Sequence, residues 1–551
     1  MNKNVPIDLH EFSYDYEKYP PIGIDFGTSN SAIAKWVNTI KHTGTRVYTL
    51  NDQVQYLMPS FVYLDSDGEF IAGKGAYNKR IAEPDRVAAC VKRKISDQSN
   101  CIPLADTFFS PIDITAKIIQ AILKSCMDTG LEKPAGIVVS VPYYFTQNQN
   151  NNIRTAVNQA LQQMPQFSCL SVEQRPKLLG LIPEPVAAAL SFSIANMESA
   201  MDDCVLLYDM GGGTLDISIL QLNISGPDIH FEILATDGDD SFGGEDFDHI
   251  LEQYVVENSA ISFNNLDEKL KRRQKGLIRT GIVSAKEDLS YAPRIDLFIG
   301  NLPCGQNIDI QLKRSEFESL LCDNCNGKNY YDKFVQILDR TITKSKVLAS
   351  AITKILPVGG STRIPFFRKI IENRLPQAKY LNAQQSDNDP LFLSVARGAA
   401  IYAAYLLDNQ TQTRFLPVDR NLQIIQRTSH NLGIHSNNGR FSIIVKANQP
   451  VPERVEKRYE PIAYCDASKK CIRARAIDVY QGNSDYVFDN THIGTIRLPV
   501  IYAHGRALEQ VKINIEFYVT ATNIIVSIII PESNKDRSDI HMQTDIHLEE
   551  K

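Results

Sequence analysis

Two carboxylates flank a glycine-rich turn in the middle of the chain. Asp209 and Asp216 lie on either side of three consecutive glycines and a threonine, between apolar runs whose alternation predicts the strands of a hairpin. A glycine turn leaves backbone N–H groups open, and such a nest binds anions, most often phosphate. The carboxylates would repel a bare phosphate, so they indicate a divalent cation beside it. The alternative is a plain tight hairpin with a glycine bulge.

The same arrangement occurs near the start of the chain. Asp25 ends a short apolar run, and Gly27, Thr28 and Ser29 form a second turn of glycine and hydroxyl residues before the next apolar run. Two hairpins of one design indicate an internal duplication. If the two turns face each other, they would hold a polyphosphate and its metal from both sides.

Further residues suited to such a site follow along the chain. Glu184 stands between two prolines at a predicted helix start, where it is either a ligand for metal or water or an ordinary first-turn glutamate. Gly243 and Gly244 open an acidic helix. Gly359 and Gly360 end a predicted strand before a helix start, and they are small enough to lie flat against a base or ribose.

Length and composition narrow the class of protein. The chain has 551 residues, 43% hydrophobic and 22% charged, which is typical of a soluble protein with more than one domain. Its net charge of −6 argues against a dedicated nucleic-acid binder. We find no apolar run long enough to predict a membrane span and no signal-peptide core in the leader, residues 1–20. The ten cysteines are therefore expected to be reduced thiols in the cytoplasm.

The apolar pattern divides the chain into segments. Residues 21–407 alternate predicted strands and helices, as in an α/β domain. Residues 408–426 begin with a polar run and predict a linker, and residues 427–533 show the short alternating runs of an all-β sandwich. Residues 534–551 predict a charged tail.

Six motifs, taken together and in this order, resemble the DnaK-type, seventy-kilodalton heat-shock chaperone family. They are residues 22–31 (Ile-Gly-Ile-Asp-Phe-Gly-Thr-Ser-Asn-Ser), 141–145, 183–189, 209–216 (Asp-Met-Gly-Gly-Gly-Thr-Leu-Asp), 243–248 and 358–365 (Val-Gly-Gly-Ser-Thr-Arg-Ile-Pro). Residues 431–434 and 479–482 are similar to the family's β domain. The resemblance implies an actin-like ATPase of two duplicated ribonuclease-H-like lobes, followed by a peptide-binding β-sandwich. The cofactors it implies are ATP or ADP and Mg²⁺.

The resemblance also assigns roles to residues. Lys92, in a Val-Lys-Arg-Lys run, matches the family's catalytic lysine, which positions the attacking water, although alone it would be interpreted as a solvated lysine. The implied catalytic set is Lys92, Glu184, Asp209 and Thr214, and the implied metal set is Asp25, Asp209 and Asp216. The implied nucleotide set cradles the phosphates or lines the adenosine pocket: Gly27, Thr28, Ser29, Asn30, Gly211, Gly212, Gly213, Gly243, Gly244, Glu245, Lys286, Ser290, Gly359, Gly360, Ser361 and Arg363.

Several positions depart from the family pattern. Where the family tends to have a glutamate near the ribose and an arginine stacked on adenine, the chain has Val283 and Glu287. The loss of a planar cation over the base predicts weaker or altered nucleotide affinity. Gly180 and Pro183 replace the positions that face J-domain partners, so J-domain stimulation is not expected.

The linker and the β domain depart as well. Residues 421–426 keep Leu422 and Ile424, which can dock, but lose both acidic ends, which predicts weaker coupling between domains. Asn437 aligns with an arch residue and Arg475 with a central pocket position, so either the register differs or the site prefers acidic or polar clients. The residues after Pro531 are too few for a helical lid, which predicts fast peptide release.

The leading functional hypothesis is an ATP-driven chaperone that hydrolyses ATP to control the binding of unfolded polypeptides. A nucleotide-exchange factor is an implied partner, whereas nucleic acid and membrane are not. A second hypothesis is an ATP-gated scaffold with weak hydrolysis and one dedicated partner, which the altered adenosine helix and β pocket favour. A third, a sugar or metabolite kinase of the same superfamily, is disfavoured by the C-terminal sandwich.

Overall fold

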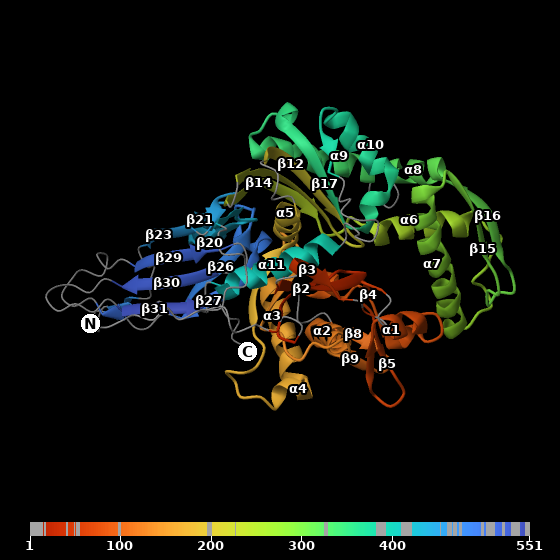
Figure 1. Cartoon of the computed structure of the whole chain (residues 1–551), viewed down its shortest axis with the longest axis horizontal. Helices are drawn as coiled ribbons and strands as arrows, with labels where there is room; N and C mark the ends of the chain where they lie inside the picture. Colours follow the sequence, from red (N-terminus) through yellow and green to blue (C-terminus); the bar gives the residue numbers. More distant parts are fainter. Residues whose placement is uncertain are drawn as a thin grey trace.

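The chain folds into two α/β lobes and an all-β domain (Figure 1). The first lobe is drawn red to orange, the second yellow to green, and the β domain blue. Helix α11 (Ser394–Asp408) returns to the first lobe and packs on its sheet and on α5 (Glu184–Ala195). The computed structural model describes residues 15, 18–39, 42–48, 50, 55–96, 101–195, 201–225, 228–323, 329–381, 393–408, 421–451, 453–459, 465–466, 471–472, 476–497, 501–502, 513–520, 524–530 and 540–545.

The first lobe is organised around a mixed sheet in the order β11-β10-β1-β2-β3, with β4 paired to β2. Strand β1 runs parallel to β10 and antiparallel to β2. Every residue of β10 is buried, as expected for a strand covered on both faces. The bounds are β1 (Pro21–Asp25), β2 (Asn30–Thr39), β3 (His42–Val47), β4 (Met58–Pro59), β10 (Gly136–Val141) and β11 (Leu178–Pro183).

The second lobe repeats this arrangement in the sheet β18-β17-β12-β13-β14-β19-β22. Strand β12 runs parallel to β17 and antiparallel to β13, as β1 does with β10 and β2. This shared topology supports the predicted duplication and places Asp25 and Asp209 at equivalent strand ends. The bounds are β12 (Met201–Met210), β13 (Leu215–Ser225), β14 (Asp228–Asp239), β17 (Ile352–Val358), β18 (Lys379–Tyr380), β19 (Asn421–Arg427) and β22 (Pro450–Val451).

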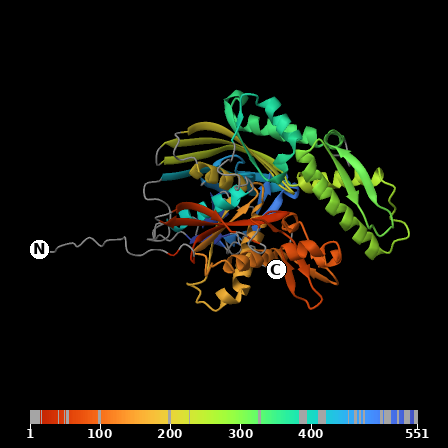
Figure 2. The same ribbon diagram turned by 45° about the vertical axis from the view of Figure 1, so that its right-hand side comes forward.

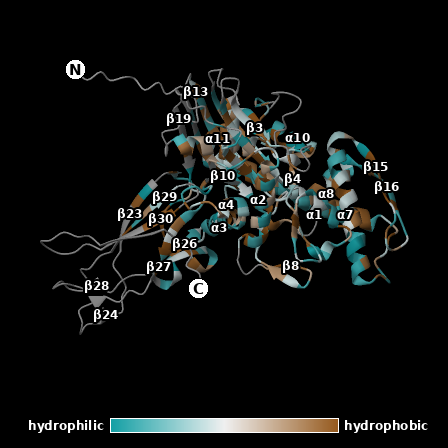
Figure 3. Cartoon of the chain, turned by 60° about the horizontal axis from the view of Figure 1, so that its bottom comes forward, coloured by the Kyte–Doolittle hydropathy of each residue, from teal (hydrophilic) through white to brown (hydrophobic). Residues whose placement is uncertain are grey.

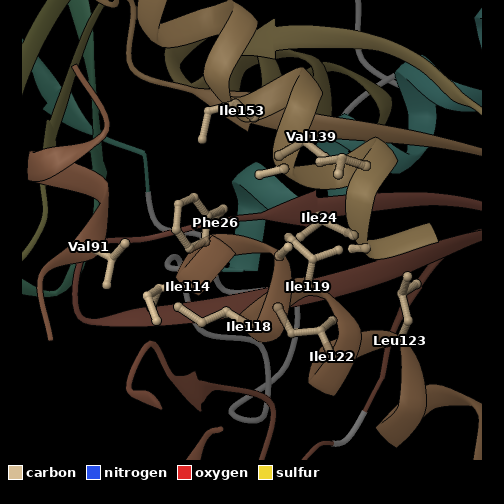
Figure 4. Close-up of a cluster of buried hydrophobic side chains, with 14 of the residues drawn as sticks. Ile24, Phe26, Val91, Ile114, Ile118, Ile119, Ile122, Leu123, Val139 and Ile153 are labelled. Carbon is tan, nitrogen blue, oxygen red and sulfur yellow. The ribbon is translucent and has the colours of Figure 1, made fainter. Parts of the chain in front are cut away.

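Helix α2 (Pro111–Met127) illustrates how local sequence sets these elements. The side chains of Ser110 and Asp113 form a capping box that begins the helix. Isoleucines three or four residues apart then bury one face of it. Figure 4 shows Ile118 and Ile122 of this helix beside Ile24 of β1 in the first lobe's core.

The remaining elements cover or extend the two sheets. In the first lobe they are β5 (Val62–Leu64), β6 (Phe70–Ala72), α1 (Lys74–Lys79), β7 (Val87–Ala88), β8 (Ile102–Leu104), β9 (Thr107–Phe109), α3 (Gln147–Gln163) and α4 (Pro165–Ser168). In the second lobe they are α6 (Gly244–Glu257), α7 (Glu268–Tyr291), β15 (Arg294–Ile299), β16 (Ile308–Lys313), α8 (Arg314–Cys322), α9 (Tyr330–Ser345) and α10 (Pro365–Arg374).

Figure 2 shows the two lobes one above the other, and Figure 3 shows hydrophilic residues along α7. Among the described helices, none combines the length and apolar composition that crossing a bilayer requires.

The β domain contains two four-stranded antiparallel sheets, β21-β20-β26-β27 and β23-β29-β30-β31. Buried residues from both sheets share one apolar core, such as Leu432 and Val479 from the first and Phe517 and Val526 from the second. A separate three-stranded sheet has the order β24-β25-β28. The bounds are β20 (Asn431–His435), β21 (Phe441–Val445), β23 (Glu453–Tyr459), β24 (Cys465–Asp466), β25 (Cys471–Ile472), β26 (Ala476–Gly482), β27 (Thr491–Arg497), β28 (Ile501–Tyr502), β29 (Ile513–Val519), β30 (Ile524–Ile530) and β31 (Ile540–Asp545).

Two segments differ from their sequence prediction. Where the sequence predicts a linker, β19 joins the second-lobe sheet as a strand, because β14 supplies hydrogen-bonding partners that no local pattern reveals. Where it predicts a charged tail, β31 pairs with β30, since a short strand-forming run lies among the charges. The leader except residues 15 and 18–20, the linker residues 409–420 and Arg475 lie outside the described residues.

Candidate functional site

Five charged side chains gather where the two sheets present their strand ends. Asp25 ends β1, and Asp209 and Asp216 stand directly opposite each other on β12 and β13. Glu184 is the first residue of α5, and Lys92 lies in the short 3-10 turn Val91–Lys94. Their charges act on one another, so the two predicted hairpins deliver their carboxylates to one place.

Lys92 and Glu184 form a buried ion pair at the centre of this cluster. Lys92 Nζ lies 2.5 Å from Glu184 Oε1, and the two residues are 5% and 6% exposed. Burial disfavours the charged amine, but the negative charges of Glu184 and Asp25 outweigh it and raise the pKa of Lys92. Lys92 is therefore a buried, protonated residue and not a solvated member of a charge run.

The carboxylates of the cluster carry more negative charge than the chain compensates. Burial, and then the charge of Glu184, raise the pKa of Asp25 to about 6. Burial and the charge of Glu184 also raise the pKa of Asp209 and the pKa of Asp216. Four carboxylates face one lysine, and a divalent cation is the group that would neutralise such an excess.

The described residues hold no complete set of direct metal ligands. Within the part of the chain that the structure covers, no three acidic, histidine or cysteine side chains are arranged to hold an ion by themselves. The carboxylates therefore fit an ion whose remaining ligands are water and phosphate oxygens, as is usual for Mg²⁺.

The two glycine turns touch each other across the lobes. A Cβ on Gly212 would lie 2.1 Å from Ser29 Oγ, and one on Gly213 would lie 2.8 Å from Thr28 Oγ1. A side chain at either position would displace the hydroxyl that it meets or push the turns apart. Within the first turn, a Cβ on Gly27 would lie 2.0 Å from the carbonyl oxygen of its own loop at Asn30.

A second layer of polar contacts supports the turn of the second lobe. Gly244 N donates to Gly211 O over 3.1 Å, and Ser361 Oγ donates to the same oxygen over 2.8 Å. Lys286 Nζ donates to Gly244 O over 2.9 Å and pairs with Asp248 at 2.8 Å. The structure thus brings residues predicted from four separate segments to one loop.

The residues at the predicted adenosine pocket differ in exposure, because Lys286 and Ser361 are buried whereas others face solvent. Arg363 and Glu287 are exposed, and Val283 is partly exposed. Ser290 Oγ donates to the Lys286 carbonyl of its own helix over 3.4 Å. Asn30, at the start of β2, is also exposed.

The two glycines after β17 have different surroundings. Gly359 has a φ of 84°, and a Cβ there would lie 2.6 Å from Asp209 Oδ1. Gly360 has no atom within 4 Å of such a Cβ. Gly359 is therefore required beside the carboxylates, whereas Gly360 borders open space.

Arg93 is a site residue that the sequence pattern did not single out. Its Nη2 donates to Gly213 O over 2.5 Å and to Asp246 Oδ2 over 2.7 Å, so it joins the first lobe to the turn of the second. Its position beside Lys92 was the available signal.

Ser140 and Cys90 also contact predicted site residues. Ser140 Oγ, from β10, donates to Asp25 Oδ1 over 2.9 Å and helps to orient that carboxylate. Cys90 Sγ lies 2.7 Å from Glu245 Oε2, and Ser29 Oγ donates to the other oxygen of the same carboxylate over 3.3 Å. Neither position has a distinctive sequence pattern.

Comparisons with known proteins agree with this geometry. The family model described as "Hsp70 protein" matches residues 100–551. The "Chaperone protein DnaK" of Thermotoga neapolitana is 28% identical over 503 residues, which cover 90% of this chain and 76% of that protein. The predictions of the family, the ATPase activity and the chaperone function are thereby confirmed. The chain belongs to the Hsp70 family, whose members are ATPases that act as molecular chaperones.

Proposed function

We propose that ATP is bound and hydrolysed between the two lobes, at the cluster around Lys92 and Glu184. The observation that carries this assignment is the buried lysine–glutamate pair among carboxylates from both hairpins. A fixed ammonium group there would orient an attacking water and offset the charge that develops on the phosphate. Thr214, at the end of the glycine turn, would add a hydroxyl to the same cleft. No covalent intermediate is required.

The same proposal includes Mg²⁺. Asp25, Asp209 and Asp216 would hold the ion through its water ligands. Bound there, the ion would neutralise charge on the phosphates. The touching turns of Thr28, Ser29 and the glycines from Gly211 to Gly213 would then close on the phosphates from both lobes.

The β domain is proposed to bind extended or unfolded polypeptide segments under control of the nucleotide. Asn437 at the predicted arch position and Arg475 at the predicted pocket position together support a preference for polar or acidic clients, the alternative being a different register. Gly180 and Pro183 of β11 argue against J-domain stimulation. A nucleotide-exchange factor as partner and a cytoplasmic location complete the proposal.

Steady-state ATP turnover tests the assignment of the site. Lys92→Ala and Thr214→Ala are expected to lower turnover by roughly 10²- to 10⁴-fold, the usual contribution of a positioned catalytic group. Lys94→Ala is the matched control, because Lys94 belongs to the same charged run but is exposed. An unfolded client should stimulate the wild type. If the wild type shows no turnover, the ATP-gated scaffold replaces this proposal.

A further inference from the structure

The β domain is joined to the lobes by the strand β19, which changes partner along its length. Its residues Asn421 to Ile425 pair in parallel with β14 of the second lobe. Its last two residues, Gln426 and Arg427, pair antiparallel with β22 of the β domain. Arg427 therefore stands where the chain leaves one sheet and enters the next.

The guanidinium of Arg427 reaches both of these sheets. Its Nε donates to Ile233 O of β14 over 2.7 Å, and its Nη2 lies 2.5 Å from Glu232 Oε1 on the same strand. Its Nη1 donates to Asn448 O of the β domain over 2.9 Å. One planar group thus binds two parts of the protein in three directions, a geometry that lysine does not offer.

The backbone of Arg427 reaches a third part, the first lobe. The hydroxyl of Tyr143, just after β10, donates to Arg427 O over 2.8 Å. Tyr143 is buried, and it contacts the ring of Tyr144, which in turn meets the ring of His430 in the β domain. Arg427 is therefore held by both lobes and by the β domain at once.

These contacts make the junction sensitive to the relative position of the lobes. The carbonyl of Arg427 is tied to the first lobe and its guanidinium to the second. Movement of one lobe against the other must stretch one set of these bonds. The ion pair is largely shielded, with side chains 19% and 26% exposed, so losing it is costly.

We propose that Arg427 is a positioning residue that couples the β domain to the ATPase lobes. The inference rests on the proposed function, in which nucleotide controls the client site. It also revises the expectation of weak coupling. Residues 421–426 lack the acidic ends expected from the family, but Arg427, which follows them directly, pairs with Glu232 of the second lobe. Arg427 acts through β19 and touches none of the residues assigned to ATP.

The test uses the full chain with Arg427→Ala and Arg427→Lys. Client stimulation of ATP turnover should fall at least about fivefold in the alanine variant, the lower range of typical couplings between sites. Basal turnover should stay near wild type, and amide exchange at residues 421–427 should accelerate. The lysine variant should recover only part of both. Arg454→Ala is the matched control, since Arg454 pairs with Glu516 within the β domain and is 69% exposed.

A charge reversal separates coupling from general stability. Glu232→Arg combined with Arg427→Glu should restore more stimulation than either single change, because each single change leaves two like charges side by side. Stimulation is compared at a temperature well below the melting temperature of the least stable variant, so that loss of folded protein does not contribute. Wild-type stimulation and strand protection in Arg427→Ala would overturn the inference. If the wild type shows no stimulation by client, the proposed function fails. The rate of amide exchange in β19, compared between the wild type and Arg427→Ala, then still decides whether Arg427 holds the strand.

Discussion

The proposed phosphate end and the proposed adenosine end of the nucleotide site are built differently. At the phosphate end, Lys92, Glu184, Asp209 and Asp216 are all at most 9% exposed, and turns from two lobes touch. At the adenosine end, Glu287 and Arg363 are exposed and the family's usual residues are replaced. A buried array of charges loses much when one member changes, whereas a residue in water loses little. The difference leads us to expect that a substitution at the phosphate end costs more than one at the adenosine end.

Gly212 gives the sharpest test of the closed phosphate end. Gly212→Ala places a Cβ 2.1 Å from Ser29 Oγ, so either this hydroxyl rotates away from its place in the site or the two turns separate. Overpacking costs about 1–3 kcal/mol, and where that cost falls on the closed arrangement that holds nucleotide, affinity drops by roughly 5- to 150-fold. Titration calorimetry with ATP measures the loss of affinity. Gly211→Ala, whose Cβ would meet no atom within 4 Å, is the matched control and should lose much less.

The dependence of nucleotide binding on pH tests the charge of the same end. The pKa of Asp25 is raised to about 6 by burial and by Glu184, so its carboxyl is protonated below that pH and ionised above it. Only the ionised form attracts Mg²⁺. The affinity for magnesium-ATP should therefore fall as the pH drops below about 6, by up to about tenfold per unit for one competing proton. Asp25→Asn should bind more weakly and remove the share of this dependence that Asp25 contributes, while Asp209 and Asp216, whose pKa values are also raised, keep theirs. An unchanged profile would contradict the assignment.

The stability of the nucleotide-free protein should respond in the opposite sense. A carboxyl whose pKa is raised on folding keeps its proton up to a higher pH in the folded state than in the unfolded state. Its contribution to the free energy of unfolding is therefore present at low pH and is lost as the pH rises from about 4 to about 6. Melting temperatures measured across this pH range, with and without Mg²⁺, report both the loss of stability with rising pH and the stabilisation by the ion. Added ion should stabilise the protein above pH 6 and have little effect at pH 4.

The meeting of the two glycine turns could be predicted from the sequence because its signals are local. Asp209, three glycines and Thr214 occupy one turn, and the second hairpin repeats the design. Arg93 and Ser140 could not be found in this way, since their partners are 120 and 115 residues distant along the chain. Arg93 meets its partners only when the two lobes pack, and Ser140 meets Asp25 only when β10 pairs with β1.

The same limit explains why two strands, β19 and β31, were not predicted. β19 is a strand because β14 and β22 flank it, and β31 because β30 offers a free edge. A short run without regular alternation has no strand signal until such partners are present. The two α/β lobes were predictable because the duplication repeats over long segments.

The adenosine end should show the smallest effect, and Glu287 tests it. Glu287→Arg restores a planar cation where the family stacks one on adenine, and an exposed cation–π contact is worth about 0.5–1 kcal/mol. ATP affinity should therefore rise by roughly two- to fivefold, with turnover at saturating ATP unchanged. Glu287→Gln is the matched control, because it removes the charge without adding a planar cation and should give a smaller gain. A gain of equal size in both variants would assign the effect to charge repulsion alone. Tight ATP binding by the wild type, unaffected by either change, would mean that base recognition does not depend on this face of α7.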